Sequence, residues 1–200
     1  MTSEIQKRLA SSDPILERII RQVPPPIFES TQDVFHDLMS CVLEQQIHYR
    51  STKKTFQKML HAANLERLTV ENFEVFEATS LGSIKLAMGK YETIIGILEF
   101  WKANDVHWQL LSDEEVILKL SSIKGIGRWT IDMILLYTLQ RPNVFPFDDY
   151  HLKLIMVSLY GLDPKVKLKA QMMDISKNWE NQKSLAVLYL LAWKQYSKKL

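Results

Sequence analysis

The stretch that decides the fold is Ile123-Lys-Gly-Ile-Gly-Arg-Trp129, which reads IKGIGRW. The chain has only six glycines, and two of them stand here one residue apart. Upstream, Ser112 and Glu115 have the spacing of a capping box for the helical run DEEVILKLSS. Downstream, RWTIDMILLYTLQ has helical spacing as far as Arg141-Pro142. We therefore predict a hairpin of two helices with IKGIG as its turn.

Glycine suits such a turn for two physical reasons. Gly125 and Gly127 can adopt positive φ without a Cβ penalty, and they leave room for a flat, dense object to approach the backbone. The amides at the start of the second helix form a ready anion site, to which Lys124 and Arg128 add charge. The turn therefore predicts contact with phosphate. The alternative for a bare Gly-x-Gly turn is a tight connection without a ligand.

The rest of the chain favours helices and shows no sustained strand alternation, so we predict an all-α fold. An amphipathic segment opens at Asp13-Pro14 and ends at Pro24-Pro25-Pro26, because three prolines cannot continue a helix. A helix from Asp33 breaks near 45–49 and is followed by a second, lysine-bearing helix. A helix YHLKLIMVSLY is expected to stop at Gly161. Further helices are expected at about 70–78, 81–87, 90–103, 164–178 and 182–197.

Composition excludes several classes of protein. Of the 200 residues, 46% are hydrophobic and 24% charged, which is ordinary for a globular chain, and the net charge is +2. The single Cys41 excludes an intramolecular disulfide and an iron–sulfur cluster, and the five histidines lack the spacing of metal ligands. No apolar run reaches transmembrane length and no signal region is apparent, so we expect an intracellular protein that needs no membrane.

The motifs together resemble one family. The hairpin LSSIKGIGRWT, the loop VFPFDDYHLK and the segment FHDLMSCVLEQQI occur in the order and at the separations of the helix-hairpin-helix DNA glycosylases, most closely the 3-methyladenine DNA glycosylase II branch. The weaker MGKYETIIGI and WENQKSLAVLYLLAW extend the resemblance from Asp13-Pro14 to about Trp193. It implies one glycosylase domain over residues 1–200. Two helical lobes would flank an active-site cleft, without the N-terminal β-rich domain of larger relatives.

The resemblance implies a monofunctional DNA glycosylase of base excision repair that releases damaged, chiefly alkylated, purines from duplex DNA and acts as a monomer. It assigns the catalytic carboxylate to Asp149, with Asp148 expected to be the helix N-cap. Cleavage of an N-glycosidic bond leaves positive charge on the sugar, which an ionised carboxylate stabilises. Relatives that also nick the strand carry a lysine nucleophile where this chain has Trp129.

A flipped-out base needs an aromatic pocket, and alkylated purines carry a charge that aromatic rings attract. The motif positions assign Trp129 and Tyr150 to this pocket, with Trp179 and Trp193 as additions. The chain departs from the family at Met133 and Gln182, where aromatic residues are common, and this leaves open a neutral lesion or a narrower set of alkylated bases.

The resemblance also implies a set of backbone contacts and a wedge. The wedge that fills the gap of the flipped base is assigned to Gln46 or Ile47, with a simple helix corner as the alternative. The remaining DNA contacts are Lys124, Gly125, Gly127, Arg128, Thr130 and Lys153. No cofactor is required. Hairpins of this family hold Na⁺ or K⁺ through main-chain carbonyls, which here would be those of Ser121, Ile123 and Ile126.

The basic stretch Lys165-Val-Lys-Leu-Lys169 could follow a phosphate backbone, although sequence alone favours solvated surface. Two other functions compete with the enzyme. One is a helix-hairpin-helix DNA-binding module that lacks catalysis, which the polar Gln182 would suit. The other is a helical interaction protein, which predicts no salt-dependent affinity for DNA.

Overall fold

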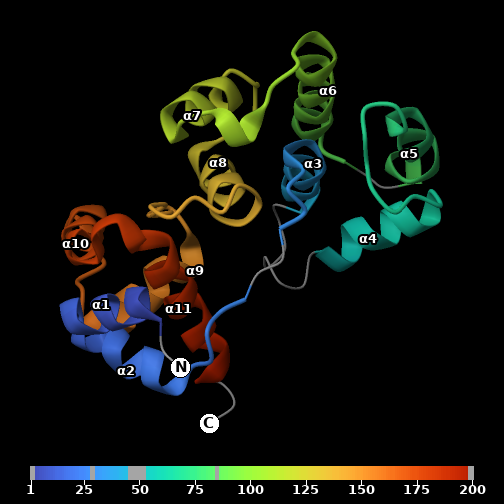
Figure 1. The fold of residues 1–200 in the computed structure, drawn as a ribbon. Coiled ribbons are helices and arrows are strands. Elements are labelled where there is room, and N and C mark those ends of the chain that lie inside the picture. Colours follow the sequence, from blue (N-terminus) through green and yellow to red (C-terminus); the bar gives the residue numbers. More distant parts are fainter. Residues whose placement is uncertain (1–2, 28–29, 45–52, 84–85, 198–200) are drawn as a thin grey trace. The chain divides into compact units, whose positions relative to one another are not determined.

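The computed structural model describes residues 3–27, 30–44, 53–83 and 86–197. Every regular element in these ranges is a helix, which confirms the all-α prediction (Figure 1). The chain forms two compact units. Unit 1 combines both ends of the chain, Met1–Glu29 and Gln140–Leu200, and unit 2 is the central segment Ser30–Leu139. The predicted cleft between two lobes stays a prediction.

Unit 1 is built around its last helix, which packs against α2 and α9. Tyr189 and Leu190 of that helix, with Leu16 and Ile19 of α2, have their side chains fully buried. The elements in chain order are α1 (Glu4–Ser12), α2 (Pro14–Gln22), α9 (Tyr150–Tyr160), α10 (Leu168–Ser176), the kinked segment η4 (Lys177–Gln182) and α11 (Lys183–Tyr196).

A single buried carboxylate ties three elements of unit 1 together. Oδ1 of Asp13 caps α2 by accepting from the amides of Ile15 and Leu16 at 2.9 and 3.1 Å. Its Oδ2 accepts from the Tyr160 hydroxyl at 2.7 Å and from Nε1 of Trp179 at 2.8 Å. Asp13 therefore joins the start of α2 to the end of α9 and to η4, with hydrogen bonds to both of its oxygens.

Unit 2 packs α3 against α4, α6 and the α8–η3 helix. Its core contains Leu38 and Met39 of α3, Ile94 and Ile97 of α6, and Leu120 of α7, each almost fully buried. The elements are α3 (Val34–Glu44), α4 (Lys53–Ala62), α5 (Phe73–Thr79), η1 (Leu81–Ser83), α6 (Met88–Ala103), η2 (Trp108–Leu110), α7 (Asp113–Ser121), α8 (Arg128–Met133) and η3 (Ile134–Thr138).

The helix that follows the hairpin widens into a π-helix at η3. The amide of Leu139 donates to the carbonyl of Ile134 at 2.9 Å, five residues back. At the end of this wider turn, the Thr138 hydroxyl donates to Oδ2 of Asp37 at 2.7 Å, and the Thr31 hydroxyl donates to the same oxygen at 2.7 Å. The helical run predicted up to Arg141 is therefore confirmed as far as Thr138, with its second half a π-helix instead of an α-helix.

Other helix boundaries also differ from the prediction. The sequence did not predict α1, although Ser3 and Gln6 form a capping box at its start. In the segment 81–87 only Leu81–Ser83 is described as helical, and α10 begins at Leu168 rather than near 164. The capping box of Ser112 and the stop of α9 at Gly161, where φ is 64°, are confirmed. Within the described ranges no helix is long and apolar enough to cross a membrane.

We expect Asp13→Ala to lower the free energy of unfolding by about 2–4 kcal/mol. The substitution removes the cap of α2 and leaves the buried Nε1 of Trp179 and the Tyr160 hydroxyl without their acceptor. Denaturant-induced unfolding, followed by tryptophan fluorescence, measures the change.

Ser112→Ala is the matched control, because Ser112 caps α7 through the Glu115 amide at the surface. Its expected cost is about 1 kcal/mol. If Asp13→Ala costs no more than Ser112→Ala, Asp13 is an ordinary cap and not the anchor of unit 1.

Candidate functional site

The hairpin turn lies in unit 2 and is held by apolar anchors. After α7, the amide of Ile123 donates to the Leu120 carbonyl at 3.2 Å, and the amide of Ile126 donates to the Ile123 carbonyl at 3.1 Å. The side chains of Ile123 and Ile126 are buried, while Lys124, Gly125 and Gly127 between and after them are exposed. The alternation of apolar and small or charged residues thus presents the backbone of the turn to solvent.

The two glycines serve different purposes. Gly125 has φ of +91°, and a Cβ there would lie 2.0 Å from Oγ1 of Thr93, so only glycine fits against α6. Gly127 has φ of −94° and is the N-cap of α8, and a Cβ there would meet no atom within 4 Å. The expected need for positive φ therefore holds at Gly125 alone. At Gly127 neither the backbone angle nor a neighbouring atom of the protein requires glycine. The open space beside Gly127 is what the close approach of an outside molecule to the backbone would need.

Both cations of the hairpin already face a carboxylate. Nζ of Lys124 lies 2.9 Å from Glu92, and Nε of Arg128 lies 2.8 Å from the buried Asp132 one turn further on. These pairs orient the two side chains at the edge of the turn. They also reduce the net positive charge that the turn offers to a phosphate.

Three further predicted residues follow on α8. Trp129 is half-buried, whereas Thr130 and Met133 are buried.

Burial raises the pKa of the Cys41 thiol to about 12, although a hydrogen bond with Thr130 acts in the opposite direction. Cys41 therefore stays protonated at neutral pH and is not a nucleophile there.

Asp149 begins α9 in unit 1, and here one prediction is wrong. Oδ1 of Asp149 accepts from the Leu152 amide at 2.7 Å, so Asp149 is itself the N-cap, and its exposed fraction is only 8%. Asp148, which was expected to be the cap, is exposed and pairs with Lys153 at 3.0 Å. The expectation that Asp148 is the cap is thus wrong, because two consecutive aspartates give the same sequence signal for a cap. The catalytic role assigned to Asp149 stays a prediction.

The aromatic residue after Asp149 is open to solvent. Tyr150 is 66% exposed, and its ring lies next to that of His151 at 5.4 Å. Nδ1 of His151 lies 2.5 Å from Nζ of Lys194, so α11 supports the first turn of α9. Nothing in the sequence indicated this contact, because the two residues lie 43 positions apart.

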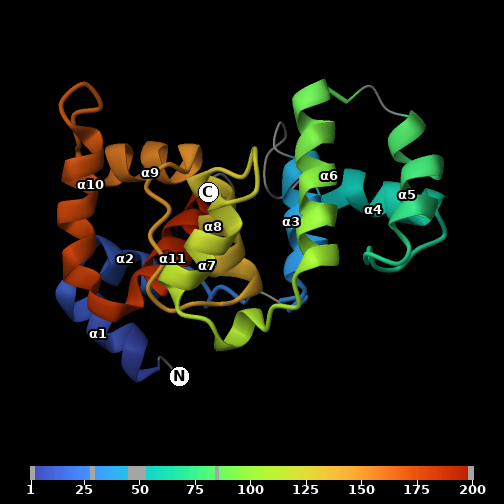
Figure 2. The ribbon, with the colours of Figure 1, turned by 90° about the horizontal axis from the view of Figure 1, so that it is seen from above.

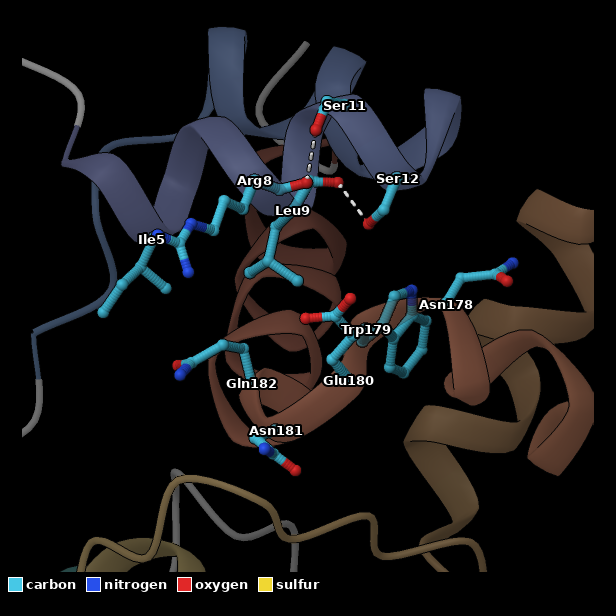
Figure 3. A pocket seen from close by; sticks show the side chains of 10 residues that line it. All are labelled: Ile5, Arg8, Leu9, Ser11, Ser12, Asn178, Trp179, Glu180, Asn181 and Gln182. Carbon is cyan, nitrogen blue, oxygen red and sulfur yellow. Dashed lines mark hydrogen bonds between the residues drawn. The ribbon is translucent and has the colours of Figure 1, made fainter.

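Trp179 and Gln182 line a cavity of about 320 Å³ between α1 and η4 (Figure 3). Asp149 and Tyr150 are not among its lining residues. Trp179 is only 1% exposed, and it stacks edge-on against Phe145 in addition to its bond with Asp13. The structure thus shows Trp179 as part of the core of unit 1, and a role for it in a base pocket stays a prediction.

The other predicted residues stay predictions. Gln46 and Ile47 lie outside the described residues. For the cation at the hairpin, the carbonyl of Ile123 already accepts from Ile126, and it keeps a second lone pair for an ion. Ser121 is exposed beside it. In the described part of the chain, no group of three or more His, Cys, Asp or Glu side chains could hold a metal.

The predicted site residues thus fall into two sets. Trp129, Met133 and the hairpin belong to unit 2, and Asp149, Tyr150, Lys153, Trp179 and Gln182 belong to unit 1. Within unit 1, the structure brings Asp149, Tyr150 and Lys153 together on the first turn of α9.

We expect Gly125→Ala and Gly127→Ala to separate the two kinds of glycine. Gly125→Ala forces a strained φ and a clash with Thr93, so the free energy of unfolding should fall by about 1–3 kcal/mol or more. Gly127→Ala should stay within about 0.5 kcal/mol of the wild type, because its backbone and surroundings accept a methyl group. Thermal and denaturant unfolding measure both changes, and equal costs for the two substitutions would refute the assignment.

The sequence matches no known family model, but it is similar to individual proteins. It is 27% identical over 188 residues to DNA-3-methyladenine glycosylase 1 of Schizosaccharomyces pombe, a match that covers 90% of this chain and 79% of that protein. It is 29% identical over 195 residues to a DNA-3-methyladenine glycosylase of Bacillus subtilis, covering 91% of this chain and 64% of that protein. The chain spans only 58% of another Bacillus subtilis relative, YfjP.

Solved structures agree with the sequence relatives. The structure of Schizosaccharomyces pombe 3-methyladenine DNA glycosylase in complex with abasic DNA superposes with a TM-score of 0.74 at 24% identity, and the match covers 99% of this chain and 98% of that one. The predicted resemblance is confirmed: this chain has the fold of the helix-hairpin-helix DNA glycosylases, and DNA-3-methyladenine glycosylases are among its sequence relatives.

Proposed function

We propose that the chain is a monofunctional DNA glycosylase that hydrolyses the N-glycosidic bond of alkylated purines in duplex DNA. The observation that carries this proposal is Asp149, a carboxylate that is 8% exposed and held in place at the head of α9. It stands at the position that the motif FPFDDYHLK assigns to the catalytic acid. The names of the sequence relatives support the substrate class.

The chemistry needs one carboxylate in a fixed orientation. As the bond between C1′ and the base nitrogen breaks, its electron pair leaves with the base and positive charge develops on the sugar. An ionised carboxylate in a water-poor site stabilises that charge and orients the water whose oxygen forms the new bond to C1′. The Leu152 amide fixes Oδ1 of Asp149, so the carboxylate does not have to reorganise during the reaction.

The substrate base also has to leave the duplex. Enzymes that act on a base flip it out of the stack and hold it against aromatic faces. Trp129 and Tyr150 are our candidates, because both keep part of the ring accessible. An alkylated purine carries a positive charge, so a ring face attracts it by cation–π interaction. It is also a good leaving group, so the reaction needs no strong acid beside the base.

We expect no strand cleavage, because Trp129 follows the hairpin glycines at the position where a lysine would be needed. Lyase activity needs an amine that attacks C1′ and forms a Schiff base. At that motif position this chain has Trp129, whose indole nitrogen is not a nucleophile. Water is then the attacking group, and the products are a free base and an intact strand with an abasic sugar.

The duplex is held chiefly through its backbone in this proposal. Gly127 and the first turn of α8 form the surface on which a phosphate fits, because the open side of Gly127 allows close approach. Lys124 and Arg128 add charge once a phosphate competes with Glu92 and Asp132 for them. A monovalent cation on the carbonyls of Ser121, Ile123 and Ile126 would add further charge at this turn. One chain acts on one duplex, with Gln46 or Ile47 as the wedge.

We expect Asp149→Asn to lower the rate of base release by at least about a hundredfold. Asparagine still caps α9 well, so the fold and the DNA affinity should be preserved. The measurement is the amount of free 3-methyladenine released from alkylated duplex DNA in single-turnover reactions, with circular dichroism and duplex binding as checks of the variant.

Asp148→Asn is the control, because Asp148 is an exposed carboxylate of the same loop. The substitution removes its ion pair with Lys153 and leaves Asp149 unchanged. Its rate of base release should stay close to that of the wild type. A wild-type protein that binds duplex DNA but releases no base would make the chain a binding module. An active Asp149→Asn variant would instead show that the carboxylate is not catalytic.

A further inference from the structure

The connection from α9 into α10 carries three lysines that the proposed reaction does not use. Lys165 and Lys167 precede α10, and Lys169 lies in its first turn. Lys165, Lys167 and Lys169 lie within five positions of one another, and all three are exposed. In Figure 2 this connection stands at one end of unit 1, where α9 and α10 meet. We call these three residues the basic turn.

The backbone of the basic turn is held in a defined shape by one glutamine. Nε2 of Gln171 donates to the carbonyl of Asp163 at 2.9 Å and also to that of Val166, and its Oε1 accepts from the Asp163 amide at 3.3 Å. Gly161 starts the turn with φ of 64°, and Lys167 ends it with φ of 41°, directly before α10. A non-glycine residue at positive φ is held there by its surroundings, so the lysines project from a fixed scaffold.

The charges of the basic turn are not compensated. In the described part of the chain, none of the three lysines forms an ion pair with a carboxylate. Asp163, Asp174 and Asp148 have other partners. Oδ1 of Asp163 accepts from the Lys165 amide, Asp174 pairs with Lys177, and Asp148 pairs with Lys153. By contrast, Lys124 and Arg128 of the hairpin each have a carboxylate partner.

One contact places the basic turn beside the loop of the candidate catalytic acid. Nζ of Lys169 lies 3.8 Å from the centre of the Phe147 ring, two residues before Asp149. Cation–π contact orients the Lys169 side chain while leaving its other side to solvent. The start of α10 adds its partial positive charge next to Lys167.

We propose that the basic turn is a second contact to the phosphate backbone of duplex DNA, separate from the hairpin. This inference rests on the proposed function, because it assumes that unit 1 contacts the DNA strand next to the nucleotide whose base is released. Uncompensated, fixed lysines fit phosphates better than paired ones, since no internal ion pair has to break on binding. Such contacts position the duplex without reading its sequence.

The consequence is a specific dependence on salt. Each phosphate that a lysine neutralises releases counterions and steepens the plot of log affinity against log salt concentration by about 0.9. The contacts should act on affinity alone, because the lysines are assigned no role in breaking the bond. Loss of the basic turn should therefore raise the dissociation constant about equally for damaged and undamaged duplexes.

The test compares the full chain with the triple variant Lys165→Gln/Lys167→Gln/Lys169→Gln. Fluorescence anisotropy with a short unmodified duplex, over about 50 to 200 mM KCl, should give a salt slope lower by roughly two to three and an affinity lower by about tenfold or more at low salt. The single-turnover rate of base release at saturating enzyme should not change.

The matched control is Lys7→Gln/Lys119→Gln/Lys177→Gln. It removes the same charge, but from lysines that stand beside Glu4, Glu115 and Asp174. Lys7 and Lys177 are exposed, and Lys119 is half-buried. If the control lowers the slope and the affinity as much as the basic-turn variant does, general charge explains the effect and the inference is wrong. If the basic-turn variant binds like the wild type, the inference is also wrong. A wild-type chain with no salt-dependent affinity for DNA would overturn the proposed function itself.

Discussion

The hairpin depends on a place where its backbone can pack against the Thr93 side chain only because Gly125 has no side chain. A Cβ on Gly125 would lie 2.0 Å from Oγ1 of Thr93, so α6 and the turn meet with no room for even a methyl group. This contact fixes where the turn ends and therefore where α8 begins. The exposed backbone at Gly127, the cation of Arg128 and the ring of Trp129 all take their positions from that start. The candidate phosphate site is thus a consequence of tight packing on its inner side.

Two aspartates in unit 1 both cap a helix but differ in the surroundings of the carboxylate. Asp13 and Asp149 both cap a helix by accepting amide hydrogen bonds with Oδ1. The second oxygen of Asp13 accepts from Tyr160 and Trp179, which makes Asp13 a structural anchor. Asp149 stands beside an exposed tyrosine at the solvent end of its helix. A cap is therefore compatible with catalysis, because the capping bond orients the carboxylate that the reaction would use.

The positive charges of the chain follow a related division. The net charge of +2 does not show that the lysines differ greatly in their surroundings. Lys124 of the hairpin pairs with Glu92, whereas the lysines of the basic turn project from a connection that Gln171 holds by hydrogen bonds. A protein of nearly balanced charge can thus present a locally cationic surface. The strength of that surface depends on which lysines lack an internal partner, and counting residues does not show this.

Features that depend on neighbours along the chain were predictable from the sequence. The all-α class, the capping box of Ser112, the stop at Gly161 and the hairpin itself depend on hydrogen bonds within one helical turn, so their residues stand side by side in the sequence. The resemblance to glycosylases also came from short motifs. The tertiary structure alone decided which of Asp148 and Asp149 caps α9, why Gly125 must be glycine, and that Trp179 serves the core. It also decided the π-helical turn and left the three lysines of the basic turn without a carboxylate partner in the described part of the chain. The cap of α9 is local, but two consecutive aspartates give the same sequence signal for it. The packing of Gly125 and Trp179 depends on atoms that folding brings together from distant positions, and no local pattern records such distances.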